Sequence, residues 1–221
     1  ATDTANNSST DTAELVIDTT APTTGDGTNT IAFNDGGDEF VNADEADNVT
    51  LTGAIEAGAT VDSITISDGT ATLTVAGDDI TIDENGNVSV TGQDLSSLQD
   101  GELTVTMTVT DTAGNTGTVT DTTALDTTAP DVSIDDVLTQ DNTPALSGAI
   151  NDDTATIVVT VNGTDYPATN NGDGTWTLDD NTLPALTDDT YTVTVTATDT
   201  ANNSSTDTAE LVIDTTAPTT G

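Results

Sequence analysis

Hydrophobic and polar residues alternate strictly in several parts of this chain. The clearest cases are residues 103–110, Leu-Thr-Val-Thr-Met-Thr-Val-Thr, and residues 191–198, Tyr-Thr-Val-Thr-Val-Thr-Ala-Thr. A period of two places every second side chain on the same face, which is typical of a half-buried β-strand. Threonine fills most of the polar positions, and its β-branched side chain favours strands. No useful stretch has the helical period, so the sequence predicts an all-β protein.

The alternating runs fall into two sets of predicted strands. The first set has an irregular edge near 31–41, followed by strands at 49–55, 61–67, 71–75, 79–82, 87–91, 103–110 and 117–125. The second set has strands at 132–138, 145–150, 156–162, 165–169, 175–179, 190–198 and 206–213. Asn85-Gly86 and Asn162-Gly163 lie between neighbouring strands, and Asn-Gly is a strong hairpin signal.

The chain also repeats itself. Residues 1–25 and 197–221 are identical, and residues 109–130 align without gaps on residues 197–218. The anchor Asp-Thr-Thr-Ala-Pro therefore begins at Asp18, Asp126 and Asp214, with spacings of 108 and 88 residues, each the size of one β-sandwich. The repeat predicts a strand fragment of a preceding domain at 1–18, complete domains at 19–126 and 127–214, and a linker to the next repeat at 215–221.

The charge of the chain has one sign only. Its 221 residues include 40 carboxylates and no lysine, arginine or histidine, which gives a formal net charge of -40. Side-chain salt bridges, histidine chemistry and nucleic-acid binding are thereby excluded. There is no cysteine either, so metal ions are the candidate cross-link between domains. This composition points to an extracellular, cation-rich setting and to a metal ion that prefers oxygen ligands.

Nothing in the sequence indicates an enzyme or a membrane-inserted segment. Residues 36–40 spell Gly-Gly-Asp-Glu-Phe, a diguanylate cyclase signature, but no basic group is present to hold a nucleotide triphosphate. Paired carboxylates can hydrolyse glycosides, but the aromatic platform of such a cleft is missing. We expect Trp176, Tyr166 and Tyr191 to be core aromatics. No apolar run is long enough to span a membrane.

The motifs taken together resemble the bacterial Ig-like extender repeats of giant RTX-type and biofilm-associated surface adhesins. The resemblance rests on Ala-Thr-Asp-Thr-Ala-Asn-Asn at 197–203, Val-Thr-Asp-Thr-Ala-Gly-Asn at 109–115, the three Asp-Thr-Thr-Ala-Pro anchors, residues 40–46 with 51–61, and residues 173–178. It implies tandem Ig-like antiparallel β-sandwiches arranged end to end. It also implies that calcium at the domain junctions stiffens a monomeric rod, which holds a terminal adhesive domain away from the cell.

The residues independently favour calcium. Ca²⁺ takes six to eight oxygen ligands, whereas zinc and copper sites would use the histidine or cysteine that this chain lacks. In an Ig-like sandwich the entering linker and the loops after the second and sixth strands share one end. The predicted metal ligands are therefore Asp126, Asp152, Asp153 and Asp199 for the second domain, Glu45, Asp47 and Asp100 on the facing end of the first, Asp18, Glu56 and Asp111 for the first domain, and Asp214 in the last linker.

Two questions stay open at this point. Each candidate carboxylate has a plainer interpretation as a turn residue, because Asp and Asn cap turns in most proteins. The predicted function, a calcium-stiffened spacer of a cell-surface adhesin, also has two rivals. One is a module that recognises a sugar or a protein, and the other is a surface-layer or biofilm matrix protein that assembles laterally.

Overall fold

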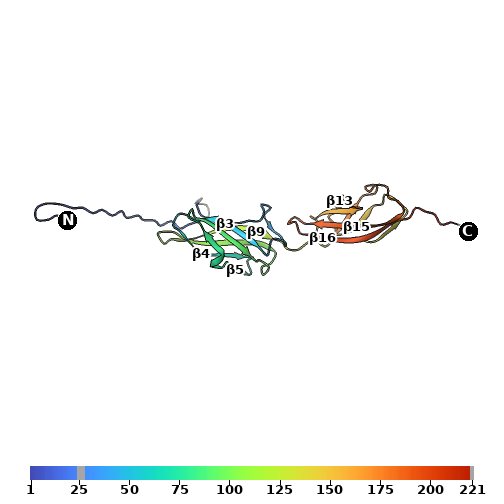
Figure 1. Cartoon of the computed structure of the whole chain (residues 1–221). Helices are drawn as coiled ribbons and strands as arrows, with labels where there is room; N and C mark the ends of the chain where they lie inside the picture. The colour runs from blue at the N-terminus through green and yellow to red at the C-terminus, as the bar shows by residue number, and fades with distance from the viewer. Residues whose placement is uncertain (24–27, 220–221) are drawn as a thin grey trace.

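The computed structural model describes residues 1–23 and 28–219. Residues 24–27, inside the predicted first domain, and residues 220–221, at the end of the predicted last linker, lie outside the described residues. Two β-rich domains follow one another along one axis, and the two ends of the chain point away in opposite directions (Figure 1). Residues 1–20 are exposed throughout.

The first domain is a sandwich of two sheets. The four-stranded sheet has the order β1 (Thr30–Phe33), β3 (Val49–Ala54), β7 (Asn87–Gln93) and β6 (Ile80–Ile82). The five-stranded sheet has the order β2 (Phe40–Val41), β9 (Thr116–Leu125), β8 (Gly101–Thr110), β4 (Thr60–Ser67) and β5 (Thr72–Thr74). One 3-10 turn, η1 (Gly77–Asp79), precedes β6.

The second domain has the same plan in a more continuous form. Its strands are ordered β10 (Val137–Thr139), β16 (Ser204–Ile213), β15 (Asp189–Thr198), β12 (Thr156–Val161), β13 (Thr164–Asn170), β14 (Thr175–Leu178) and β11 (Leu146–Ala149). The two layers are joined through β13, because its first part pairs with β12 and its last residues pair with β14. The all-β, Ig-like fold class is thus confirmed.

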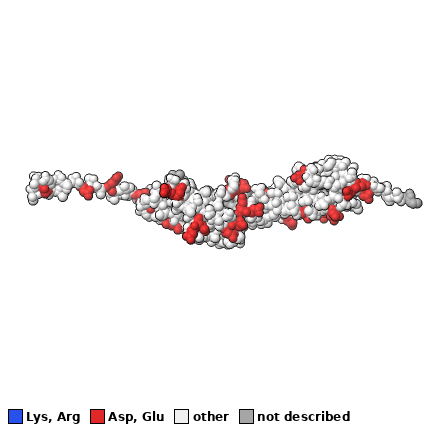
Figure 2. Space-filling view, in the orientation of Figure 1, with Lys and Arg blue, Asp and Glu red and all other residues white. Residues whose placement is uncertain are grey.

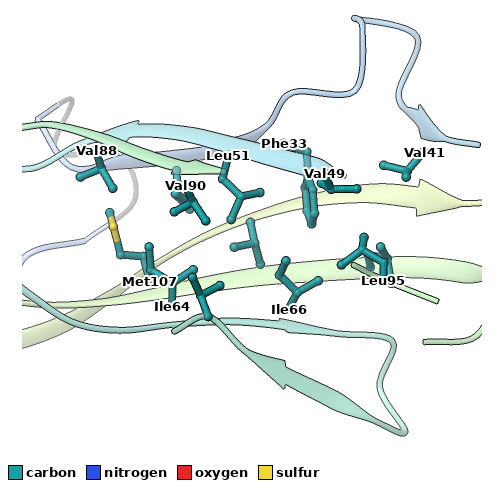
Figure 3. Close-up of a cluster of buried hydrophobic side chains, with 14 of the residues drawn as sticks. Phe33, Val41, Val49, Leu51, Ile64, Ile66, Val88, Val90, Leu95 and Met107 are labelled. Atoms are coloured by element: carbon teal, nitrogen blue, oxygen red, sulfur yellow. The ribbon is translucent and has the colours of Figure 1, made fainter. Parts of the chain in front are cut away.

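Each domain has its own apolar core on one side of the linker that begins at Asp126. The alternating residues of β4 and β8 point inward against β3 and β7, so that Leu51, Ile64 and Met107 meet between the sheets (Figure 3). In the second domain Trp176 is fully buried, and its indole Nε1–H donates to the Ser133 carbonyl at 3.0 Å. Tyr166 and Tyr191 are half-buried against this core, as predicted.

The first strand of the second domain differs from the prediction. Residues 132–138 were expected as one strand, but only Val132 bridges antiparallel to Ile150, and β10 then pairs in parallel with β16. In the first domain β1 likewise pairs with β3, whereas β2 pairs in parallel with β9. Each sandwich therefore contains one short parallel pair, because its first segment pairs with one layer and then crosses to pair with the last strand in the other.

The predicted hairpins are confirmed at both Asn-Gly pairs. Asn162 and Gly163 have φ of 51° and 73° and join β12 to β13, as a type I′ turn requires. Gly86, with φ of 83°, lies between β6 and β7, where an added Cβ would be 2.4 Å from the Ile55 carbonyl oxygen. No helix within residues 1–23 and 28–219 is long and apolar enough to cross a membrane.

Candidate domain junction and cation sites

A five-residue loop with Asp in its first and Asn in its last position recurs through the chain. We call these the Asp–Asn loops, and they are Asp3–Asn7, Asp83–Asn87, Asp111–Asn115 and Asp199–Asn203. In each, the Asp Oδ1 accepts the Asn backbone N–H at 2.8–2.9 Å, and the Asn Nδ2 donates to the Asp Oδ2 at 2.7–3.0 Å. The fourth residue has positive φ and is always Gly or Asn, the residues that tolerate it. The loops are thus held by local contacts.

Two of these loops also hold a linker. The loop between β8 and β9 reaches back through Asn115, whose Nδ2 donates to the Asp18 carbonyl at 3.2 Å. The loop between β15 and β16 does the same through Asn203, whose Nδ2 donates to the Asp126 carbonyl at 2.8 Å. Each domain therefore binds the Asp-Thr-Thr-Ala-Pro anchor that precedes it through the same position of the repeat.

The loop after β15 touches the first domain directly. The Oδ1 of Asn203 accepts the Ala43 backbone N–H at 2.9 Å, and the Nδ2 of Asn202 donates to Asp38 Oδ2 at 3.3 Å. The two domains are therefore joined by hydrogen bonds between their own groups as well as by the linker.

Each linker is also held by the domain that precedes it, through an Asp at the C-terminal end of that domain. Asp100 accepts the hydroxyls of Thr127 and Thr128, each at 2.8 Å. In the second domain Asp188 accepts the hydroxyls of Thr215 and Thr216 at 2.6 and 2.7 Å. These side-chain hydrogen bonds lower the pKa of Asp188. For Asp100 burial opposes the change, but the two threonine hydroxyls still lower its pKa.

The linker proline packs onto the last strand of the domain that it enters. Pro22 lies over Gly117 so closely that an added Cβ there would be 1.8 Å from the Pro22 carbonyl oxygen. In the second domain Ser205 stands at the matching position, and its hydroxyl donates to the Pro130 carbonyl. Because proline also restricts its own φ, the anchors are ordered where they enter a domain.

Four of the predicted metal ligands surround one hollow at the entrance of the second domain. The hollow has a volume of about 310 Å³ and is lined by Asp126, Asp152, Asp153 and Asp199, together with Asn151 and the linker residues 128–130. Its donor set contains carboxylate, amide, hydroxyl and carbonyl oxygens only, which is the chemistry that Ca²⁺ binds. However, no three carboxylates in the described part of the chain already stand at metal-binding distance from one another.

These four carboxylates are not equally free. Asp199 belongs to an Asp–Asn loop, so both of its oxygens accept hydrogen bonds from Asn203. Asp152 Oδ1 accepts the N–H and hydroxyl of Thr154, and Asp126 Oδ1 accepts the Thr128 N–H at 3.1 Å. No residue in the described part of the chain donates a hydrogen bond to the exposed Asp153 carboxylate. Asp153 is therefore the carboxylate most available to a cation.

The remaining predicted ligands lie elsewhere. Glu45 lines a separate hollow with Asp44 and Asp35, and its Oε2 accepts the Asn42 N–H. Asp47 is exposed nearby, and Asp100 holds the linker instead of lining either hollow. Asp214 Oδ1 accepts the Thr216 N–H.

The set predicted for the first domain lies at that domain's N-terminal end. Asp18 Oδ1 accepts the Thr20 N–H at 2.9 Å. Asp111 belongs to an Asp–Asn loop, and the hydrogen bond from the Asn115 side chain lowers its pKa. Glu56 is half-buried, and the loop that it starts meets the β8–β9 loop where Gly58 approaches Thr112. Neither of the two hollows described above is lined by any of these three carboxylates.

The charge is spread over the whole molecule. Carboxylates are scattered over both domains in Figure 2, with a broader band toward the end of the first domain that faces the second. No side-chain cation offsets them, so each pair of carboxylates about 4 Å apart repels by roughly 4 kcal/mol at a surface-like dielectric. A cation that entered such a junction would reduce this repulsion.

Three residues that organise the junction were missed in the sequence. In the sequence, Asn115 and Asn203 stand out only as the last residues of the motifs at 109–115 and 197–203, and Asp188 is not among the predicted metal ligands. A signal existed, because Asn7, Asn115 and Asn203 occupy the same position of the repeat. Their role was not predicted because it depends on where the linker carbonyl lies in three dimensions.

Comparisons with known proteins agree with this architecture. Residues 123–215 match the family described as bacterial Ig-like domain. The chain is similar to a tetra-tandem repeat from the extending region of a large adhesion protein, at 29% identity over 86% of this chain and 50% of that one, with a TM-score of 0.36. It is also similar to a Ca²⁺-stabilised adhesin with which an Antarctic bacterium binds ice, at 27% identity over 84% of this chain and 48% of that one, with a TM-score of 0.42.

The same fold occurs in an I-band fragment of titin, which is 14% identical over 79% of this chain and 62% of that one, with a TM-score of 0.51. That similarity concerns the tandem Ig-like fold alone. The chain spans about half the length of the two adhesin segments. No curated protein sequence matches it. The second domain is thus a bacterial Ig-like domain, and the resemblance of the chain to adhesin extender repeats is confirmed.

Proposed function

We propose that this chain is a spacer segment of a bacterial cell-surface adhesin, exposed outside the cell and without catalytic activity, in which calcium at the domain junctions stiffens a rod. One observation carries the proposal. The chain enters each domain at one end and leaves it at the other, and both linkers are gripped by matching residues, Asn115 with Asp18 and Asn203 with Asp126. Such a unit can be repeated indefinitely and adds length with every copy.

The calcium part of the proposal rests on charge and donor chemistry. The hollow bounded by Asp126, Asp152, Asp153 and Asp199 lies where the linker enters the second domain, so an ion there would contact the linker and the domain together. An ion that binds only the folded state adds about 2.7 kcal/mol of stability at a hundred times its dissociation constant. The adhesin from the Antarctic bacterium is itself described as Ca²⁺-stabilised.

The rival functions have no comparable support. Trp176 is fully buried, so the only tryptophan offers no exposed ring to a sugar. The large exposed apolar side chains of the described residues are Leu15, Val16, Ile17, Ile82 and Leu138. Three of these lie in the N-terminal tail, and the other two are single residues on different domains, which is a poor surface for lateral assembly.

Calcium titration of the whole chain tests the proposal. At fixed ionic strength, we expect calcium to raise the melting temperature of the second domain and to narrow the distribution of lengths measured by X-ray scattering. Asp153→Asn should weaken calcium binding at least tenfold without changing the fold, because its carboxylate makes no hydrogen bond to the described residues.

Asp135→Asn is the matched control. It removes one exposed carboxylate from the same domain outside the hollow and should leave calcium affinity unchanged. If calcium changes neither the melting temperature nor the maximum dimension, the calcium-stiffened rod is wrong.

A further inference from the structure

The N-terminal ends of the two domains are built alike but are covered differently. In the second domain Ala201 is completely buried and Asn203 is 6% exposed. In the first domain the matching residues are Ala113, which is exposed, and Asn115, which is half-buried. The first domain covers the end of the second, and nothing in the described residues covers the end of the first.

Asn203 connects three parts of the molecule with one neutral side chain. Its Nδ2 donates to Asp199 in its own loop and to the linker carbonyl of Asp126, and its Oδ1 accepts the N–H of Ala43 from the first domain. Both of its N–H donors and its carbonyl oxygen are therefore hydrogen-bonded at this buried position, as is usual for buried amides. The contact between Asn203 and Ala43 joins two neutral groups, so it needs no metal ion and is little affected by salt.

Asn115 makes two of the same three contacts. Its Nδ2 donates to Asp111 and to the linker carbonyl of Asp18, but its Oδ1 accepts no hydrogen bond from any residue that the structure describes. In the second domain the matching oxygen is the one that binds the neighbouring domain. The missing contact therefore identifies this end of the first domain as one half of a junction.

The chain itself indicates what the other half is. Residues 1–18, which lead into the first domain, are identical to residues 197–214, which end the second. The matching C-terminal surface lies after β10, because β10 pairs with the last strand as β2 does: Thr139 faces Ile213, and Val41 faces Leu125. The segment that corresponds to Ala43 is thus Asp141 and its neighbour Asn142.

We propose that the Asp–Asn loop between the last two strands of each domain, at the domain's N-terminal end, is a metal-independent clamp between domains. Asn203 makes this interdomain contact within the chain. Asn115 makes the same contact when the C-terminal end of a second copy of residues 127–214 lies against the first domain. The inference presumes the tandem array of the proposed function, but it requires no calcium.

The first test breaks the clamp in the whole chain and is done in chelator. Because the chain has no cysteine, Thr118→Cys and Thr192→Cys provide two unique exposed sites for spin labels, one in each domain. We expect a narrow interdomain distance distribution by double electron–electron resonance. Asn203→Leu should at least double its width.

Two further variants keep this test decisive if Asn203→Leu disturbs its own loop. Ala43→Pro removes only the donor on the first domain, and proline is tolerated there because Asn42 caps a helical turn that Ala43 begins. It should broaden the distribution as Asn203→Leu does. Asn87→Leu is the matched control, since it breaks an Asp–Asn loop away from the junction and should leave the width unchanged. If the distance distribution of Ala43→Pro is as narrow as that of the labelled chain without this change, the clamp is wrong.

The second test completes the other junction. Residues 127–196 placed before Ala1 continue directly into residues 1–18 and so rebuild a second-type domain ahead of the first. In this three-domain chain Asn115→Leu should broaden the new junction at least twofold, whereas in the 221-residue chain it should leave the existing junction unchanged. No broadening in the longer chain would overturn the assignment of Asn115. The distance measurements are then repeated with calcium. If the variants broaden the distribution in chelator but calcium does not narrow it, the clamp holds without calcium stiffening. If calcium narrows the distribution but the variants have no effect, the rod is stiffened by calcium and the clamp is wrong.

Discussion

Residues 1–23 and 197–219 have the same sequence but different structures. In the second copy, residues 204–213 form β16, paired with β15 along its whole length and with β10 at its end, and Leu211 and Ile213 are 1% exposed. In the first copy the matching Leu15 and Ile17 are 84% and 78% exposed, and no named strand forms. The loop of each copy is nevertheless the same, because Asp3–Asn7 and Asp199–Asn203 make the same hydrogen bonds. The conformation of the loop is thus determined by its own hydrogen bonds, whereas the strand forms only where neighbouring strands pair with it.

The largest expected effect comes from truncating the same leucine in the two copies. Leu211→Ala should destabilise the second domain by about 2–5 kcal/mol, because it leaves a cavity in a closed core. Leu15→Ala is the same change in the same sequence and should leave that stability unchanged. Trp176 is the only tryptophan and is buried in the second domain, so its fluorescence during urea unfolding reports that domain alone. A loss from Leu15→Ala as large as that from Leu211→Ala would mean that the first copy packs against the second domain.

This comparison also shows what the sequence could and could not predict. Strict alternation placed β8 and β15 to within about two residues, because that pattern follows from one buried face. The split of the first strand between two sheets was not visible, since the short segments β2 and β10 differ little from loop sequence. That the four carboxylates of the hollow at Asp126 lie together was predicted from the positions of the loops in an Ig-like sandwich. The role of Asn203 could not be predicted, because its side-chain hydrogen bonds with Asp126 and Ala43 depend on the tertiary fold.

A smaller effect is expected at the next matched pair, Asp207 and Asp11. Asp207 Oδ2 accepts the Ile134 N–H at 2.9 Å, and this backbone hydrogen bond lowers the pKa of Asp207. A lowered folded pKa contributes stability that is present above the unfolded value of about 3.9 and is lost as the pH falls through the folded value. Asp207→Asn should therefore lower the melting temperature at pH 7 and flatten its fall in acid. Asp11→Asn removes the same charge and should do neither, as thermal scans from pH 7 to 2 would show.

The linkers allow a more local comparison. Thr215 and Thr216 are held by Asp188, whereas no hydrogen bond among the described residues joins an Asp of another domain to Thr19 or Thr20. Asp188→Ala should speed amide hydrogen exchange of Thr215 by about tenfold, since the Thr215 N–H loses its acceptor. Thr19 gives the reference rate for the same linker without such an anchor. An unchanged rate at Thr215 would show that the linker is ordered by its own proline and not by Asp188.

The smallest effect tests whether an Asp–Asn loop needs a domain at all. The side-chain hydrogen bond from Asn7 lowers the pKa of Asp3, although this loop lies in the exposed tail. The Asn7 side-chain amide resonances should therefore shift with a midpoint below the ordinary aspartate value of about 3.9, and the loop should be lost as the pH falls through that midpoint. Asp3→Asn should abolish the shift at Asn7 while leaving the corresponding titration of Asn87 with Asp83 intact, because the hairpin loop has its own lowered pKa from the Asn87 hydrogen bond. A midpoint at the ordinary value would mean that the loop is imposed by a folded domain, and the division between local loops and partner-made strands would then fail at its simplest point.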